Sequence, residues 1–242
     1  MLKFTGSKDI YGFNEMTLLD DFISLFYPRL CAGCNTPLVK GEAVLCLNCL
    51  ADLPRTNFHL DNENPVFQQF TGRANITFAT SFCSFDKGGR LQHLLHQLKY
   101  KGSREVGLKM GMLLGYDLIQ SAFYQEIDAI IAVPLHPKKE KKRGFNQSIE
   151  ICKGLSASMN RPQILGNLIR EVHTDSQTRK GRFERWENVS GIFSVKNPAL
   201  LAGKHLLLVD DVVTTGATLE ACCSPLLEIP GVKVSIATLA YA

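Results

Sequence analysis

Short apolar runs and helical patterns follow one another along most of the chain. Apolar runs, or apolar residues in alternation, predict strands at 76–86, 130–133, 192–195, 206–209 and 232–241, and residues 163–172 are also strand-like. Apolar residues three and four positions apart predict helices at 17–26, 90–98, 105–123, 147–159 and 215–228. The run at 206–209 is short, continuous and followed by turn residues and a helical pattern. It therefore predicts a strand buried on both faces of a parallel sheet.

The pattern also divides the chain. We predict an N-terminal domain at 17–60, with a helix and a cysteine-rich segment, and a second domain at 72–242. Residues 53–71 contain two prolines and several asparagines, which indicates a linker. A chain of 242 residues is long enough for one large domain or two modest ones.

Candidate chemistry follows the strand at 206–209 directly. The strand runs into Asp210 and Asp211, and a polar loop follows, which comprises Thr214, Thr215, Gly216, Ala217 and Thr218. In open α/β sheets ligands bind beyond the carboxyl ends of the strands. The threonine hydroxyls, and backbone N–H groups that Gly216 lets turn inward, predict a phosphate site at the start of the next helix.

The two acids need a partner other than the phosphate, because their charge would repel it. Sugar hydroxyls or a Mg²⁺ ion suit them, since Mg²⁺ prefers oxygen ligands. A ribose 5-phosphate satisfies both halves of the motif. The alternative interpretation is a strand that ends in a solvated acidic pair with a threonine helix cap. A Walker-type nucleotide site is not supported, because the chain lacks G-x-x-x-x-G-K-[ST].

Four of the eight cysteines form C-x2-C-x11-C-x2-C, namely Cys31, Cys34, Cys46 and Cys49. This spacing predicts a tetrahedral zinc site, and with four cysteine ligands no position is left for water, so its role is structural. Disulfides and an iron–sulfur centre are the alternatives. The remaining cysteines lie in apolar surroundings and are expected in the core.

Two basic stretches are further candidates. Residues 138–143 place five cations within six positions just after the strand at 130–133, which predicts a mobile, electropositive loop. We expect its lysines to be solvated, whereas the planar guanidinium of Arg143 suits phosphate oxygens. Lys99 and Lys101 lie at a junction between two predicted elements, where their side chains could contact a pyrophosphate.

Bulk composition adds little. With 45% hydrophobic and 21% charged residues the chain is typical of globular proteins, and a net charge of +4 permits a phosphorylated ligand or nucleic acid without arguing for either. No apolar run approaches the roughly eighteen residues that a membrane span needs, and the N-terminus lacks a signal-peptide pattern. We expect a cytoplasmic protein without membrane insertion.

The run from Leu206 to Thr218 resembles the signature of type I phosphoribosyltransferases, which bind phosphoribosyl pyrophosphate (PRPP). Two further features accompany it, the four-cysteine segment and Val-Pro-Leu-His…Arg-Gly-Phe-Asn-Gln at 133–147. Together they make residues 17–242 similar to the ComF family, which joins a zinc ribbon to a phosphoribosyltransferase domain. Thr174, Gln177, Arg185 and Asn188 match as well.

The resemblance implies a fold and a site. The fold is α/β, a phosphoribosyltransferase-like parallel sheet flanked by helices, with a small N-terminal zinc ribbon. Asp210 and Asp211 would contact ribose and Mg²⁺, Thr214 through Thr218 would hold the 5-phosphate, and Leu135, His136 and Arg143 would contact pyrophosphate.

Two functions are compatible with the resemblance. The first is an enzyme that transfers phosphoribosyl from PRPP to an amine or base. The second is a non-catalytic accessory protein of DNA uptake and competence, which binds nucleic acid or the uptake machinery through the ribbon and the basic loop.

Overall fold

The computed structural model describes residues 26–171 and 192–242. Its centre is a four-stranded sheet in the order β1-β6-β5-β2, in which every neighbouring pair is parallel. The strands are β1 (Ala79–Ser84), β2 (Ala129–Ala132), β5 (His205–Val213) and β6 (Lys233–Tyr241). Three of the strands are the predicted ones with small shifts at their ends, and the fourth, β5, extends through the acidic pair.

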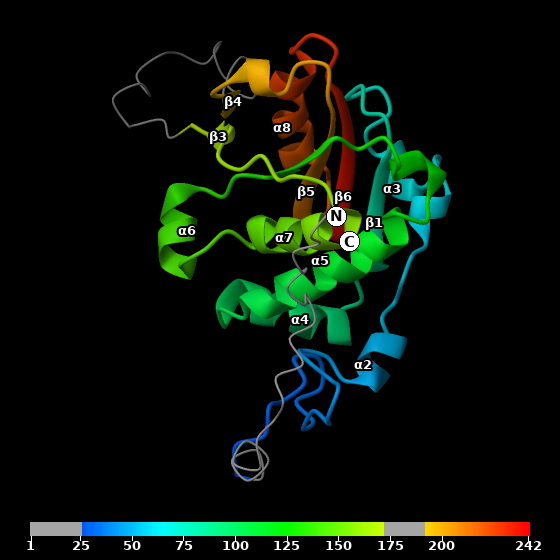
Figure 1. Cartoon of the computed structure of the whole chain (residues 1–242), viewed down its shortest axis with the longest axis vertical. Helices are drawn as coiled ribbons and strands as arrows, with labels where there is room; N and C mark the ends of the chain where they lie inside the picture. Colours follow the sequence, from blue (N-terminus) through cyan, green and yellow to red (C-terminus); the bar gives the residue numbers. More distant parts are fainter. Residues whose placement is uncertain (1–25, 172–191) are drawn as a thin grey trace, which may run out of the picture.

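Helices cover both faces of the sheet (Figure 1). One face packs against α4 (Arg90–Tyr100), α5 (Arg104–Leu118) and α7 (Gln147–Met159). The other packs against α8 (Ala217–Leu227) and the antiparallel pair β3 (Leu168–Arg170) and β4 (Phe193–Val195). The short 3-10 turns η2 (Ala122–Tyr124) and η6 (Pro198–Leu200) complete the connections. The α/β fold predicted from the resemblance is confirmed.

Strand β5 separates the two cores. Leu207 and Val209 pack with α4, α5 and α7, while Leu206 and Leu208 pack on the α8 side, and all four are fully buried. This alternation is the pleat of a strand with a core on each side. The predicted doubly buried strand is therefore confirmed.

The stretch predicted as a linker at 53–71 is folded. It contains η1 (Phe58–Leu60) and α3 (Pro65–Gln68), and Val66 and Phe70 are fully buried in the core on the α8 side. Asn64 caps α3, and its amide also donates to Ala79 O at 2.7 Å, which attaches the segment to β1. Its prolines and asparagines form helix starts and caps, so the linker interpretation was wrong.

The basic stretch is a helix, α6 (Pro137–Arg143), where the sequence predicted a mobile loop. Pro137 occupies its first turn, and the His136 side chain caps it by accepting from Lys138 N at 3.1 Å. Gly144 ends it with a left-handed φ of 79° and donates its N–H to Glu140 O at 2.7 Å. Lysine, glutamate and arginine are good helix formers, so these end signals suffice for a short helix.

Some predictions lie outside the described residues. They are the helix at 17–26 apart from its last residue, and the matching positions Thr174, Gln177, Arg185 and Asn188. Within the described residues, none of the helices combines the length and the apolar character that crossing a membrane requires.

Candidate functional site

The two acids lie at the carboxyl end of β5, and their side chains have different partners. Asp210 Oδ1 accepts from Ser148 Oγ at 2.9 Å and from the backbone N–H of Asp211 at 2.8 Å. Asp211 Oδ2 lies 3.1 Å from Lys99 Nζ. Ser148 belongs to α7 and Lys99 to α4, so two helices of the same face of the sheet supply these partners.

The protonation of Asp210 is strongly affected by its surroundings. Burial, and after it the negative charge of Asp211, raises the pKa of Asp210 from 3.8 to about 7. The Asp211 N–H, Ser148 and Lys99 oppose this shift only in part. A cation or a hydroxyl donor at this carboxylate would replace the lost solvation, which is the property expected of a ligand-binding acid.

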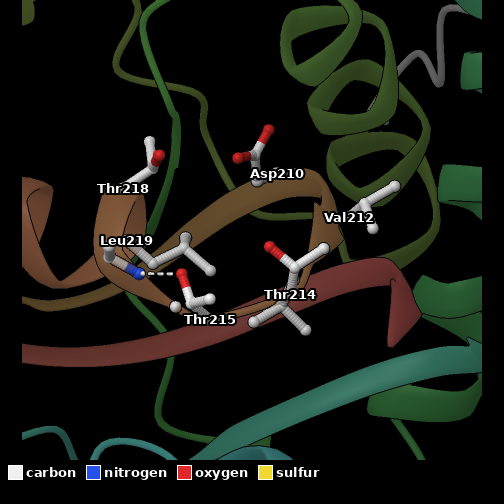
Figure 2. Close-up of a pocket in the computed structure, with 9 residues that line it drawn as sticks. Asp210, Val212, Thr214, Thr215, Thr218 and Leu219 are labelled. Atoms are coloured by element: carbon white, nitrogen blue, oxygen red, sulfur yellow. Dashed lines mark hydrogen bonds between the residues drawn. The ribbon is translucent and has the colours of Figure 1, made fainter. Parts of the chain in front are cut away.

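The predicted phosphate loop curves around a small pocket (Figure 2). Asp210 and residues 212–219 line the pocket, whose volume is about 50 Å³. Gly216 has a left-handed φ of 74°, and α8 begins at the next residue. The Thr215 hydroxyl accepts from Ala217 N at 3.5 Å, while the Asp210 carboxylate lies above the loop. Asp210 and the loop therefore share one cavity at a helix N-terminus.

A second hollow collects the predicted basic residues. It measures about 350 Å³ and lies between the end of α4 and the basic helix α6; we call it the basic groove. Its lining consists of Lys99, Tyr100, Gly102, Lys139, Lys142 and Arg143. The Arg143 guanidinium lies over the Tyr100 ring, 5.6 Å from its centroid, and Tyr100 is 69% exposed. Because Lys99 contacts Asp211 and also lines the groove, it connects the groove to the acidic pair.

The remaining predicted residues are less closely grouped. Lys101 is exposed and does not line the groove. Leu135 and His136 are half-buried and follow β2, whose partner is β5. Val133 donates to Val209 O at 2.9 Å, so residues 134–136 and the acidic pair lie at the same edge of the sheet. His136 caps α6 through Nδ1, which leaves Nε2 as its other polar atom.

Three residues that the sequence analysis did not single out contact this site. Ser148 bonds Asp210, and Gln69 and Arg73 bond the backbone of the phosphate loop. Ser148 directly follows the Arg-Gly-Phe-Asn-Gln segment, and its position at the start of a predicted helix could have identified it. No local signal marks Gln69 or Arg73, because their partners are more than 140 positions away in the chain.

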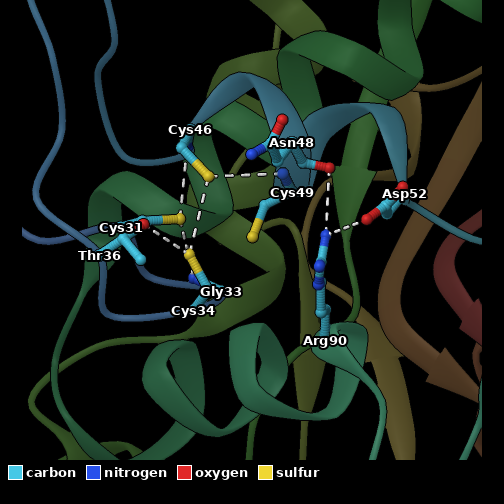
Figure 3. Close-up of polar contacts among 9 residues, drawn as sticks. All are labelled: Cys31, Gly33, Cys34, Thr36, Cys46, Asn48, Cys49, Asp52 and Arg90. Carbon is cyan, nitrogen blue, oxygen red and sulfur yellow. Dashed lines mark hydrogen bonds and ion pairs between the residues drawn. The ribbon is translucent and has the colours of Figure 1, made fainter.

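The four predicted cysteines form a compact cluster (Figure 3). Their sulfur atoms all lie within 4.8 Å of one another, and Cys34 Sγ is 3.7 Å from Cys46 Sγ. Zinc–sulfur bonds of about 2.3 Å in a tetrahedron place sulfur atoms about 3.8 Å apart, so the spacing fits the ion. The eight cysteines are all free thiols, which argues against the disulfide alternative.

Backbone N–H groups around the cluster donate to two of its sulfur atoms. N–H groups of Gly33 and Cys46 donate to Cys31 Sγ at 3.4 and 3.3 Å, and Cys49 N donates to Cys46 Sγ at 3.4 Å. Hydrogen bonding to Thr36 lowers the pKa of Cys34 to about 6, whereas burial and the neighbouring thiols raise the pKa of Cys49. A Cβ atom at Gly33 would lie 2.9 Å from Cys49 Sγ, so the tight turn needs glycine there. The donor set is compatible with a zinc ribbon.

The ribbon docks on the α/β domain beside α4. Its helix α2 (Leu47–Ala51) and the following turn face Arg90, which forms an ion pair with Asp52 and donates to Asn48 O at 3.1 Å. Cys31, Cys46 and Cys49 belong to the same apolar cluster as Leu91 and Leu94 of α4. The cysteine cluster is therefore continuous with the core of the larger domain.

Comparisons with known proteins identify the family of the chain. The phosphoribosyl transferase domain family matches residues 163–242. Competence protein F of Haemophilus influenzae is 33% identical, over 90% of this chain and 99% of that protein. Competence protein ComFC of Bacillus subtilis is 34% identical, over 83% and 78%. DNA utilization protein YhgH of Salmonella typhimurium is 30% identical, over 88% and 96%. With identities of 30–34% along 78–99% of these relatives, and with a four-cysteine cluster ahead of a phosphoribosyltransferase domain, the chain belongs to the ComF family.

Proposed function

We propose that this protein binds PRPP together with Mg²⁺ and transfers its phosphoribosyl group to an amine or a base. The observation that supports the proposal most directly is the shared pocket of Asp210 and the loop at 214–218. An acid that faces a phosphate-sized cradle repels a bare phosphate, but it suits a phosphate attached to a sugar. The phosphoribosyltransferase domain match supports the same ligand class.

Each part of PRPP has a candidate partner. The loop residues Thr214, Thr215, Gly216, Ala217 and Thr218 would hold the 5-phosphate through hydroxyls and N–H groups. Asp210 and Asp211 would accept hydrogen bonds from the ribose hydroxyls and contact Mg²⁺. The pyrophosphate would be bound by Lys99, Lys101, Leu135, His136 and Arg143.

The catalytic contribution would be positioning and electrostatics. As pyrophosphate leaves C1 of the ribose, negative charge develops on it and positive charge on the sugar ring. The basic groove would stabilise the first, and the carboxylates at the end of β5 would stabilise the second. Mg²⁺, when bound, would neutralise the leaving group. The acceptor nucleophile then forms the new bond at C1.

Isothermal titration of the full-length protein with PRPP and Mg²⁺ tests binding, and we expect saturable binding at one site per chain. A screen of nucleobases and amines for PRPP-dependent pyrophosphate release tests transfer. One pyrophosphate should appear for each phosphoribosyl product. If PRPP binds but no acceptor gives pyrophosphate release, the protein binds PRPP and the transfer reaction is excluded. If PRPP does not bind, the whole proposed function is overturned.

A second candidate function is nucleic-acid binding, which the basic groove favours. Exposed lysines provide contacts for phosphates, and the exposed Tyr100 ring, which contacts Arg143 and His96, adds an aromatic group beside them. The names of the relatives, competence proteins and a DNA utilization protein, are compatible with it. In this alternative the protein is a non-catalytic accessory of DNA uptake, and the ribbon is part of its contact surface.

The basic groove makes a specific prediction for DNA. Replacing Lys139, Lys142 and Arg143 by alanine should weaken binding of single-stranded DNA and lower the slope of log affinity against log salt by about two, because each neutralised phosphate contributes about 0.7. A triple variant at Lys87, Lys196 and Lys233, all exposed and outside the groove, is the control. If the slope of log affinity against log salt is the same for both triple variants, the basic groove is not the DNA-binding surface.

We further propose that the cysteine cluster holds a structural zinc ion. Four thiol ligands leave no open position, so the ion would supply folding free energy to a segment too small to fold alone. We also propose that the chain divides into a ribbon domain at 17–60 and a phosphoribosyltransferase domain at 72–242. The expected location is the cytoplasm, where cysteines at this spacing serve as zinc ligands and not as disulfides.

A further inference from the structure

The phosphate loop is supported from outside by the segment at 64–73, which we call the loop brace. Gln69 Nε2 donates to Thr214 O at 2.9 Å, and Arg73 Nη1 donates to Thr215 O at 2.8 Å. We propose that Gln69 and Arg73 are positioning residues for the 5-phosphate, which act by orienting the peptide groups of the loop. This inference rests on the proposed function, since it concerns the same phosphate site.

The orientation follows from peptide geometry. In a trans peptide the C=O and the next N–H point in opposite directions. Carbonyls turned toward Gln69 and Arg73 therefore turn the N–H groups of Thr215 and Gly216 the other way. Within the described part of the chain, neither of these N–H groups has an acceptor at hydrogen-bonding distance. They are thus available to an anion in the pocket that the loop lines.

Arg73 joins three parts of the structure. Besides Thr215 O, its Nη1 donates to Gln69 O at 3.1 Å, and its Nη2 forms an ion pair with Glu220 in the first turn of α8. The planar guanidinium can satisfy these directions at once, which a lysine ammonium on a flexible stem cannot do with the same geometry. The brace, the loop and the helix that follows the loop are therefore held in one arrangement.

Packing fixes the brace on both sides. Phe70 is fully buried, and a Cβ atom added to Gly216 would lie 3.0 Å from its ring, so the loop rests directly on Phe70. At the other end of the brace, Asn64 is 1% exposed and bonds the backbone of β1. The brace is thus attached to the sheet independently of the loop, which is what a positioning element requires.

The test compares Arg73→Lys and Gln69→Ala with Arg55→Ala. Arg55 is the matched control, because it also forms an ion pair, with Asp117 at 3.3 Å, and contacts no residue of the loop. We expect each brace variant to bind ribose 5-phosphate about three- to tenfold more weakly, to bind pyrophosphate as the wild type does, and to keep the wild-type melting temperature within a few degrees. The control should show no change in either affinity.

Amide hydrogen exchange gives a readout that needs no ligand. Exchange at Ala217 and Glu220, whose N–H groups donate to Thr215 Oγ1 and Gly216 O of the loop, should become at least threefold faster in the brace variants, while exchange at 206–209 stays unchanged. Unchanged exchange at Ala217 and Glu220, or an equal loss of ribose 5-phosphate and pyrophosphate affinity, would overturn the inference. If the wild type binds no ribose 5-phosphate, the proposed function fails, and the exchange data alone then decide whether the brace orients the loop.

Discussion

The double variant Asp210→Asn, Asp211→Asn will bind PRPP with Mg²⁺ at least about 100-fold more weakly than the wild type. Each acid is proposed to make a charge-assisted contact, and such contacts are worth roughly 1.5–3 kcal/mol each. Two of them amount to about 3–6 kcal/mol, or a factor of about 10² to 10⁴ in the dissociation constant. Isothermal titration measures the change. Retention of wild-type affinity would exclude the acidic pair from the site.

A stability measurement on the single variant Asp210→Asn tests whether misfolding causes this loss of affinity. The folded state favours the protonated carboxyl, because burial raises its pKa from 3.8 to about 7. The free energy of unfolding of the wild type therefore falls as the pH rises from 3.8, the ordinary pKa of the group, to about 7. Asparagine still offers an oxygen to Ser148 and to the Asp211 N–H, and it has no proton to lose. We expect the single variant to melt a few degrees higher at pH 8, with the difference shrinking toward pH 4.

Asp128→Asn is the matched control for both measurements. Asp128 precedes β2, and its Oδ2 accepts from His205 N at 2.8 Å at the opposite end of β5. The substitution thus alters an acid that bonds the same strand, but far from the pocket. PRPP affinity should stay at the wild-type value.

The parts of the site that could be predicted from sequence are those whose chemistry is local. Asp210 and the threonine loop follow a recognisable buried strand, so their place at the edge of the sheet is a consequence of strand direction. The four cysteines were equally accessible to prediction, because metal-ligand spacing is a property of short segments. Packing was not needed to find either group.

The brace could not be predicted in this way. Gln69 and Arg73 reach loop residues 145 and 142 positions away, and their own neighbours have the composition of a linker. The contact between Lys99 and Asp211 likewise depends on how α4 packs against β5. The basic stretch shows the reverse case, because Pro137 and Gly144 are local helix-end signals that indicate α6 in place of the predicted loop.

Removal of zinc will unfold the ribbon and leave the α/β domain folded. Without the ion, the ribbon retains a five-residue helix, α2, and a few isolated bridges, which are too little structure to compensate the entropy of ordering the chain. The apolar cluster that joins Cys31 and Cys49 to α4 would then open at one end. The phosphate loop and its brace contact the opposite core, on the α8 side of the sheet, so they should stay in place.

The variant Cys31→Ser, Cys46→Ser carries this test, with Cys83→Ser as its control. Cys83 is fully buried in the same apolar cluster but belongs to β1, outside the four-sulfur group. Metal analysis should give one zinc per chain for the wild type and the control, and almost none for the double variant. Limited proteolysis should then cleave the double variant within 31–52 while it still binds ribose 5-phosphate. If phosphate binding disappears along with the zinc, the ribbon contributes to the site itself, and its role is more than structural.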